Sequence, residues 1–453
     1  MWVHEREFET SAPKDGEWLS CLLAGAEGAA GQDDLMLRAV VSGIDKDRLS
    51  GEALFLSAGM DGSMRRPADP FRFVPRPYEN TSAFNAAVMI PTGVGAQVGG
   101  HAGDAGPLVK LVASVCDHVI THPNAVNASD INELPHNASY VEGSVLTRLL
   151  LGNIALQPVR QNRVLVVVDD HPDILFVNAA VNAVNAARAT YGLVCPQVVK
   201  LSPPVRLKVL YSSSGRAVGE VTNLDLLVQQ LWAMRGSYDA VAVSSVINVP
   251  AGYHQGYFDS AGEMVNPWGG VEAMLTHTLS TLLDVPTAHA PMFETRDIAN
   301  ADPGIVDPRM AAEAVSLTFL QCVLKGLQRS PRILPGAELG REGLLDVTKI
   351  SCLVMPDGCV GAATLAALSQ GIPVVAVREN ASLMNTDLTL LPWRAGQLHI
   401  VENYWEAVGV IAALKAGLAP ESVRRPLAYA PVALAEPVAL PLRASENLST
   451  PVS

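Results

Sequence analysis

Short apolar runs alternate with helical stretches along most of the chain, beginning near residue 84. The runs are rich in Val, Ile and Ala and too short for helices, so we interpret them as buried strands. Stretches such as "FVNAAVNAVNAARATYG" and "GGVEAMLTHTLSTLL" have apolar residues at helical spacing and predict helices between the strands. This alternation predicts an α/β fold, in which parallel Rossmann-like sheets are flanked by helices in two α/β halves. The predicted strands are "AAVMI", "DHVIT", "RVLVVVD", "YDAVAVSS", "VPTAHAP", "ISCLVMP" and "IPVVAV".

The first 75 residues have a different pattern. Three short runs, "EWLSCLLAG", "LMLRAVVSGI" and "EALFLSAG", are separated by Gly, Asp and Lys and predict strands of a small β-rich lobe. The proline-rich stretch "MRRPADPFRFVPRPYENTS" predicts an extended connector, and a Pro- and Gly-rich stretch near 324–346 divides the remainder. We therefore predict four parts: a lobe at 1–75, a main α/β domain with a glycine-rich loop at 84–330, a C-terminal α/β half at 345–420 and an extended tail at 421–453.

Composition narrows the class of protein. Hydrophobic residues make up 49% of the chain and charged residues 17%, which is typical of α/β proteins with buried strands. The longest apolar runs fall far short of the roughly 20 residues that span a bilayer, so we expect no membrane partner. The first residues, "MWVHEREFETSAPKDGEWLS", lack the apolar segment of a signal peptide and favour a cytoplasmic location. The apolar composition also favours a homo-oligomer.

Cysteine spacing and charge exclude two further classes. The six cysteines have no C-x-x-C spacing, which argues against a disulfide framework and against a zinc ribbon. The formal net charge of -13, with no cluster of Lys and Arg, would repel polyanions. We therefore expect no nucleic-acid partner.

The glycine-rich loop lies within "PTGVGAQVGGHAGDAGP". Its glycine spacing differs from the dinucleotide fingerprint, and no Gly-Lys-Ser/Thr follows, so NAD and ATP are disfavoured as cofactors. Pro107 suits the first turn of a helix, whose N-terminus attracts anions. We expect this loop to bind the carboxylate or phosphate of a small anionic metabolite.

Polar residues follow seven predicted strands, at the edge where parallel sheets bind ligands. His101 and Asp104 are spaced for a general base with its orienting carboxylate or for two metal ligands, and a hydrogen bond within the loop is the simpler alternative. Cys359 lies at a strand-to-helix turn that could lower its thiol pKa, although a packing role is equally open. No motif fixes a metal site, so no cofactor is firmly predicted and a divalent metal is only a candidate. The candidate residues are His101, Asp104, His122, His289 and Cys359 for catalysis; Thr92, Gly99, Gly100, Asn124, Ser244, Ser245, Asp357, Gly358, Arg378, Glu379 and Asn380 for substrate binding; and Asp169, Asp170 and His171 for a metal.

Four motifs carry a resemblance to a known family. The stretches "IPTGVGAQVGGHAGDAGP", "ITHPNAVNASDINELPHNASYVEG", "VPTAHAPM" and "VRENAS" resemble family 3326 of the domains of unknown function, found in cyanobacteria, plastids and other bacteria, over about residues 80–415. That resemblance implies no activity. The pair "GGHAGDAGP" and "PDGCVGAATLAALSQGIPVVAVREN" is also similar to two-Rossmann glycosyltransferases and UDP-N-acetylglucosamine 2-epimerases. Ala366 stands where those families have a ribose-binding glutamate.

Three functions are consistent with these observations. The leading hypothesis is an enzyme that binds a small anionic metabolite and performs non-redox acid–base chemistry, as a lyase, isomerase or hydrolase. The second is an enzyme that handles nucleotide sugars between two Rossmann-like halves. The third is a non-catalytic metabolite-binding or scaffold protein, with the N-terminal lobe as an interaction module.

Overall fold

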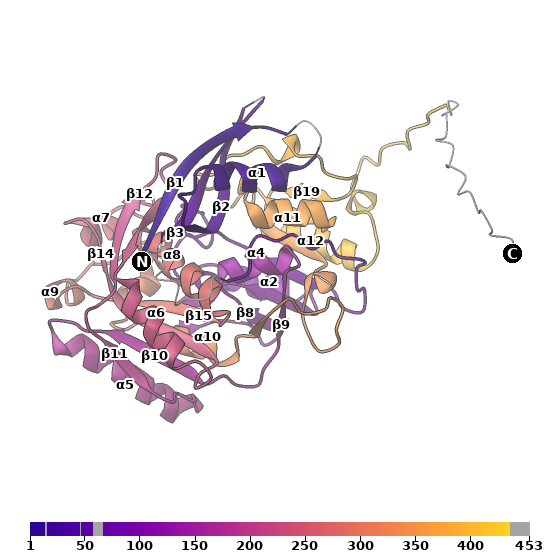
Figure 1. The fold of residues 1–453 in the computed structure, drawn as a ribbon. Coiled ribbons are helices and arrows are strands. Elements are labelled where there is room, and N and C mark those ends of the chain that lie inside the picture. The colour runs from indigo at the N-terminus through magenta and orange to yellow at the C-terminus, as the bar shows by residue number, and fades with distance from the viewer. Residues whose placement is uncertain (14–15, 46, 58–66, 435–453) are drawn as a thin grey trace, which may run out of the picture.

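The computed structural model describes residues 1–13, 16–45, 47–57 and 67–434. Two large β-sheets with helices packed on them make up most of the structure (Figure 1). This architecture confirms the predicted α/β class with parallel strands and a β-rich N-terminal region.

The first sheet has six parallel strands in the order β19-β18-β17-β4-β5-β8. Because helix α2 contacts α12 and helix α4 contacts α11, two pairs of helices cover it, and right-handed crossovers place the pairs on opposite faces. The elements are β4 (Asn85–Val88), β5 (His118–Thr121), β8 (Ala138–Tyr140), β17 (Cys352–Pro356), β18 (Val374–Val377), β19 (Leu398–Val401), α2 (Gly106–Ala113), α4 (Gly143–Leu150), α11 (Ala362–Gln370) and α12 (Tyr404–Lys415).

The second sheet has nine strands, in the order β11-β10-β14-β12-β13-β1-β3-β2 with β15 also paired to β14. Strands β10, β11, β14 and β15 are parallel, whereas β12, β13, β1, β3 and β2 form an antiparallel run. The strands are β1 (Trp2–Ser11), β2 (Asp34–Asp45), β3 (Arg48–Ser57), β10 (Val164–Asp169), β11 (Val198–Leu201), β12 (Arg206–Tyr211), β13 (Ala217–Thr222), β14 (Ala240–Asn248) and β15 (Thr287–Met292).

Helices α5, α6, α8 and α10 pack on the second sheet, and α1 (Trp18–Gly28) contacts its strands β1, β2 and β3. The buried apolar residues form two hydrophobic cores. The side chains of α6 and α8 belong to one core together with buried residues of β12 and β13, and those of α5 belong to the other. Helix α10 packs beside α5 and against β15. These helices are α5 (Ile174–Tyr191), α6 (Leu224–Ala233), α8 (Pro267–Leu283) and α10 (Leu320–Arg329).

Short elements complete the described chain. Two small two-stranded sheets pair β9 with β16 and β6 with β7. These short elements are β6 (Asn127–Ala128), β7 (Ile131–Asn132), β9 (Ile154–Gln157), β16 (Arg332–Pro335), α1 (Trp18–Gly28), α3 (Pro123–Val126), α7 (Tyr253–Asp259), α9 (Arg296–Ala299) and the 3-10 turns Ala311–Ala314, Val347–Lys349, Leu388–Leu390 and Pro420–Val423.

The sheets divide the chain differently from the predicted ranges. Strands β17, β18 and β19 of the predicted C-terminal half lie in one sheet with β4, β5 and β8 of the predicted main domain. The chain leaves this sheet after β8, builds the parallel part of the second sheet, and then returns. Strands of the N-terminal region extend the second sheet. Backbone hydrogen bonds between β1 and β13 therefore join this region to the rest of the protein.

One predicted strand of the N-terminal region is a helix. "EWLSCLLAG" falls in α1, whose buried side chains are Trp18, Leu19, Leu22 and Ala26. Their spacing of three and four residues lines one face of a helix. Conversely, the sequence does not predict strand β1, because the charged residues Glu5, Arg6 and Glu7 lie together between its buried Val3 and Phe8.

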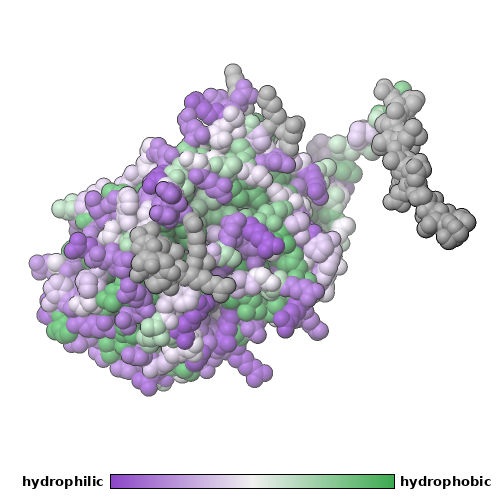
Figure 2. Space-filling view, viewed as in Figure 1, coloured by the Kyte–Doolittle hydropathy of each residue, from purple (hydrophilic) through white to green (hydrophobic). Residues whose placement is uncertain are grey.

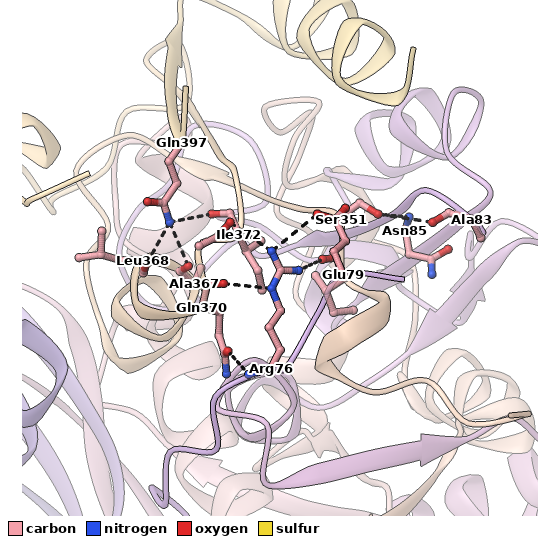
Figure 3. A network of polar contacts seen from close by, with 12 residues as sticks. Arg76, Glu79, Ala83, Asn85, Ser351, Ala367, Leu368, Gln370, Ile372 and Gln397 are labelled. Carbon is pink, nitrogen blue, oxygen red and sulfur yellow. Dashed lines mark hydrogen bonds and ion pairs between the residues drawn. The ribbon is translucent and has the colours of Figure 1, made fainter. Parts of the chain in front are cut away.

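Residues 64–66 of the predicted connector lie outside the described residues, and Arg76 fastens the described remainder against the body (Figure 3). The guanidinium of Arg76 donates to the carbonyls of Ile350, Gln370 and Gly371 at 3.1, 3.0 and 3.1 Å, and the last two end helix α11. A cation at a helix C-terminus satisfies carbonyls that have no partner within the helix. Arg76 therefore joins residues that are far apart in sequence.

We expect Arg76→Met to lower the free energy of unfolding by about 3 kcal/mol, because it leaves several buried carbonyls without a donor. Urea unfolding followed by circular dichroism measures the change. Arg72→Met in the same connector is the control, since no side-chain hydrogen bond of Arg72 is found among the described residues. Equal stability of the two variants would contradict this role.

The surface is mixed in polarity. Figure 2 shows hydrophilic and hydrophobic residues interspersed over the face in view. Within the described ranges, no helix combines the length and apolar character needed to cross a bilayer. Of the predicted tail, residues 427–434 are exposed without regular structure, and 435–453 lie outside the described residues.

Candidate functional site

A cavity of about 310 Å³ lies at the carboxyl ends of the six-stranded sheet. Residues that directly follow four of its strands line one side: 89–92 after β4, 122–124 after β5, 142–144 after β8 and 359–364 after β17. The other side comes from the second sheet, through helix α8, strand β15 and residues 37–40 of β2. The cavity thus occupies the position at which parallel sheets bind ligands.

Helix α4 and helix α8 bring a carboxylate and an imidazole together in this cavity. Glu142 is the N-cap of α4 and accepts hydrogen bonds from the backbone N–H (3.0 Å) and hydroxyl of Ser144. Its other oxygen bonds Nδ1 of His277 on α8. Burial alone would raise the pKa of Glu142, but the His277 ring and the hydrogen bonds hold that pKa below its ordinary value. The ionised carboxylate places the proton of a neutral His277 on Nδ1, so Nε2 is left as a base.

A second carboxylate and imidazole pair joins α8 to strand β15. Glu272 bonds Nδ1 of His289 at 2.8 Å, and the hydroxyl of Ser245 on β14 bonds Nε2 at 2.7 Å. Glu272 and His289 line the cavity, whereas Ser245 is fully buried behind them. Both ring nitrogens of His289 are therefore occupied, and Glu272 is the member of this pair that can exchange a proton with a ligand. His289 orients it.

His122 presents a fixed hydrogen-bond donor. Its Nε2 accepts the backbone N–H of Ile90 at 2.8 Å, so a neutral ring carries its proton on Nδ1. Burial lowers the pKa of His122 to about 4, which keeps the ring neutral near pH 7. The side chain lines the cavity next to Glu142 and His277.

His101 and Asp104 do not form a pair with each other. Nδ1 of His101 bonds the hydroxyl of Tyr257 at 2.6 Å, and Asp104 accepts the backbone N–H of Gly99 at 2.8 Å. Neither side chain lines the cavity. Burial raises the pKa of Asp104 to about 7 and lowers that of His101. The simpler interpretation of this spacing, hydrogen bonds that shape the loop, describes what the structure contains.

Protein acceptors occupy five N–H groups of the glycine-rich loop. Those of Gln97, Val98, Gly99, Ala102 and Gly103 bond Ala381, Asn380, Asp104, Glu313 and Asn124, respectively. A side chain on Gly103 would meet Ala128 at 2.4 Å, and its φ of +77° also favours glycine. The described hydrogen bonds shape this loop as a tight turn, and anion binding there stays a prediction.

The other candidate residues separate into two groups. Asn380 is fully buried and bonds both backbone groups of Val98 and the hydroxyl of Tyr404, so it supports the loop. Arg378 is exposed and pairs with Glu402 at 2.6 Å. The candidates that line the cavity are Thr92, Asn124, His122, His289 and Cys359; those that do not are Gly99, Gly100, His101, Asp104, Asp169, Asp170, His171, Ser244, Ser245, Asp357, Gly358, Arg378, Glu379 and Asn380.

Cys359 lies in the cavity wall, but its chemistry differs from the expected one. Burial raises the pKa of its thiol to about 11, so the helix N-terminus does not produce a thiolate at neutral pH. Its Sγ lies 3.5 Å from the hydroxyl of Ser382. These contacts fit the alternative packing role.

The three metal candidates lie outside the cavity, and Asp170 and His171 have other contacts. Asp170 pairs with Lys200 at 2.6 Å, and Nε2 of His171 lies 3.1 Å from the carbonyl of Phe293. Burial raises the pKa of Asp169 to about 8. In the part of the chain that the structure describes, no three His, Cys, Asp or Glu side chains are grouped to hold a metal ion.

Sequence reasoning missed most of the cavity's charged residues. Glu272 and His277 lie in the predicted helix "GGVEAMLTHTLSTLL", and nearly all of α8 is buried. A buried helix that carries Glu, His and several Thr residues is unusual, and this composition was the available signal. Arg38 and Arg216 carried no comparable signal, because their meeting depends on how β2 and β13 enter one sheet.

Comparison with known proteins gives a family and one relative. The model of a family described as protein of unknown function, DUF3326, matches residues 85–424. An uncharacterized lipoprotein of Synechococcus is 33% identical over 345 residues, which cover 75% of this chain and 93% of the relative. No solved structure matches the chain, so the likeness to nucleotide-sugar enzymes gains no support.

Proposed function

Since the chain belongs to DUF3326, a family of unknown function, we propose its function from the chemistry of the cavity. We infer an enzyme that binds a small anionic metabolite and carries out non-redox acid–base chemistry, as a lyase, isomerase or hydrolase. The observation that carries this proposal is the pairing of two imidazoles with two carboxylates, Glu142 with His277 and Glu272 with His289, in one cavity.

The paired groups supply complementary roles. Nε2 of His277 is a base backed by an ionised carboxylate, and the Nδ1 proton of His122 can stabilise negative charge on a substrate oxygen. Glu272 provides a second proton acceptor, oriented by His289. A base and a separate hydrogen-bond donor in one cavity are what abstraction of a proton next to a carbonyl requires. Apolar residues such as Ile90, Trp268 and Phe293 line the cavity beside these groups.

Proton exchange tests the proposal even while the product of the reaction is unknown. The wild-type protein is incubated in D₂O with a panel of small carboxylic acids and phosphate esters, and loss of C–H signals is followed by NMR. We expect protein-dependent exchange or turnover of at least one compound, because lyases and isomerases of this type abstract carbon-bound protons. Boiled protein and Glu272→Gln are the controls. Exchange at the same rate in Glu272→Gln, or none with any compound, would count against the proposal.

A further inference from the structure

We propose that Arg38 and Arg216 form an anion-binding subsite in the cavity wall, and that the N-terminal strands belong to the substrate site for this reason. The inference rests on the proposed function and deepens it, because it names the part of the substrate that the cavity recognises. Arg38 lies on β2, and Arg216 directly precedes β13. Both side chains line the cavity.

Two buried glutamates hold the guanidinium groups from behind. Nη1 of Arg216 bonds Glu5 at 3.0 Å and also Glu52, and Nη2 of Arg38 bonds both oxygens of Glu5 at 3.2 and 3.3 Å. The side chains of Arg216 and Glu52 are 3% and 1% exposed. Glu5 on β1 and Glu52 on β3 belong to the two strands between β13 and β2, so the shared carboxylates hold the two arginines together across the sheet.

Each guanidinium retains donors that the protein does not use. Arg216 makes its bonds through Nη1 alone, and the N–H groups on Nε and Nη2 have no acceptor among the described residues. On Arg38, Nη1 likewise has none, and Nε is buried without a partner. Buried N–H groups of a cation are costly when unsatisfied, and an anionic ligand in the cavity would satisfy them.

The charges around Arg38 and Arg216 favour an anionic group of a ligand, and not a further carboxylate of the protein, as the partner of their free N–H groups. The two glutamates balance the two arginines in formal charge, so the subsite binds by directed hydrogen bonds and not by excess charge. The positive end of helix α8 lies close by, since Gly270 packs so tightly on the carbonyl of Ala217 that a Cβ there would be 1.9 Å from it. The N–H groups of Trp268 and Gly269 in its first turn already donate to the side chain of Asn266, so this helix end contributes its dipole and not free N–H groups.

A carboxylate or a phosphate group matches this arrangement. Two guanidinium forks offer several N–H donors in fixed directions, which suits the oxygens of either group. Glu272 and His277 lie further along α8. If the anionic group of a ligand binds the two arginines, the rest of the ligand would extend toward these acid–base groups.

The subsite gives the N-terminal strands a role in specificity. The family match begins at residue 85, whereas Leu37, Arg38, Ala39 and Val40 all line the cavity. The strand is fastened beside the cavity, because Val41 N–H donates to the carbonyl of Val360 at 2.9 Å. Arg38 is therefore a substrate-recognising residue that lies outside the matched region.

Anion binding can be measured without turnover. Isothermal titration calorimetry with inorganic phosphate and with malonate as separate probes, at constant ionic strength, separates the two ligand chemistries. We expect saturable binding of at least one probe, and a dissociation constant about 10- to 100-fold weaker in Arg38→Gln, because hydrogen bonds to a charged group are lost. Arg48→Gln is the matched control, since Arg48 on β3 forms an exposed ion pair with Glu9 on β1 and does not line the cavity.

Loss of Arg216 alone would leave Glu52 buried and unpaired, so the second variant is Arg216→Gln combined with Glu52→Gln. Circular dichroism confirms that it folds, and we expect the same weakening. Binding of neither probe to the wild type, or equal binding by Arg38→Gln and Arg48→Gln, would overturn the subsite. Anion binding that persists in a protein without proton exchange would retain the subsite and refute the enzyme; exchange that is unaffected in Arg38→Gln would do the reverse.

Discussion

Replacing His277 by asparagine should lower the rate of proton exchange or turnover by about 100- to 10,000-fold, the range expected when a general base is lost. The amide nitrogen of asparagine can still donate to Glu142, as Nδ1 of His277 does, so the buried carboxylate keeps its partner. The base at Nε2 disappears. Initial rates measured by NMR with the compound found in the D₂O screen provide the comparison.

The matched control is His118→Asn. His118 is also a partly buried histidine, bonded to the hydroxyl of Ser139 at 2.8 Å, but it does not line the cavity. We expect its rate to stay near that of the wild type. A similar loss in both variants would mean that general destabilisation, and not removal of the base, lowers the rate.

The wild type should lose stability as the pH rises because of Asp169, and the variant Asp169→Asn should not show this loss. Burial raises the pKa of Asp169 to about 8 in the folded protein, whereas an unfolded aspartate titrates near about 3.9. Below pH 4 both states hold the proton, and the group has no effect on the pH dependence. Between pH 4 and pH 8 the unfolded state releases the proton while the folded state retains it, so wild-type stability falls as pH rises. Asparagine has no carboxyl proton to titrate, so the variant lacks this pH dependence.

From pH 5 to pH 8, the wild type should therefore lose about 3 kcal/mol more free energy of unfolding than Asp169→Asn. Urea unfolding at both values measures the difference. The neighbouring Asp170 serves as the control, because its ion pair with Lys200 lowers its pKa, and Asp170→Asn should show no extra dependence over this interval. Parallel behaviour of the wild type and Asp169→Asn would disprove a raised pKa.

Local patterns predicted the strands well and their partners poorly. Runs such as "AAVMI" and "IPVVAV" became β4 and β18, because short runs of Val, Ile and Ala mark buried strands wherever they lie. The assignment of these strands to one sheet, across almost the whole chain, depends on crossovers that carry no local signal. The division into a main domain and a C-terminal half followed the order of the sequence, and the sheets do not.

The candidate site was predicted in the same uneven way. The rule that ligands bind at strand carboxyl ends identified Thr92, His122, Asn124, His289 and Cys359, which line the cavity. The rule does not separate the edge of one sheet from that of another, which is why it includes Asp169 at the end of β10; Arg378 follows β18 of the six-stranded sheet but is exposed and pairs with Glu402. Glycine-rich spacing was interpreted as an anion site, although glycines equally permit a loop to fold upon itself.

The interleaved sheets have a consequence for how the chain is made. Strand β4 leaves the ribosome about 260 residues before its neighbour β17. Strand β1 is likewise synthesised long before its neighbour β13. During that interval β4 has an apolar surface and an open edge that no later strand yet covers. We therefore expect fragments that stop before β17 to aggregate instead of folding as separate domains.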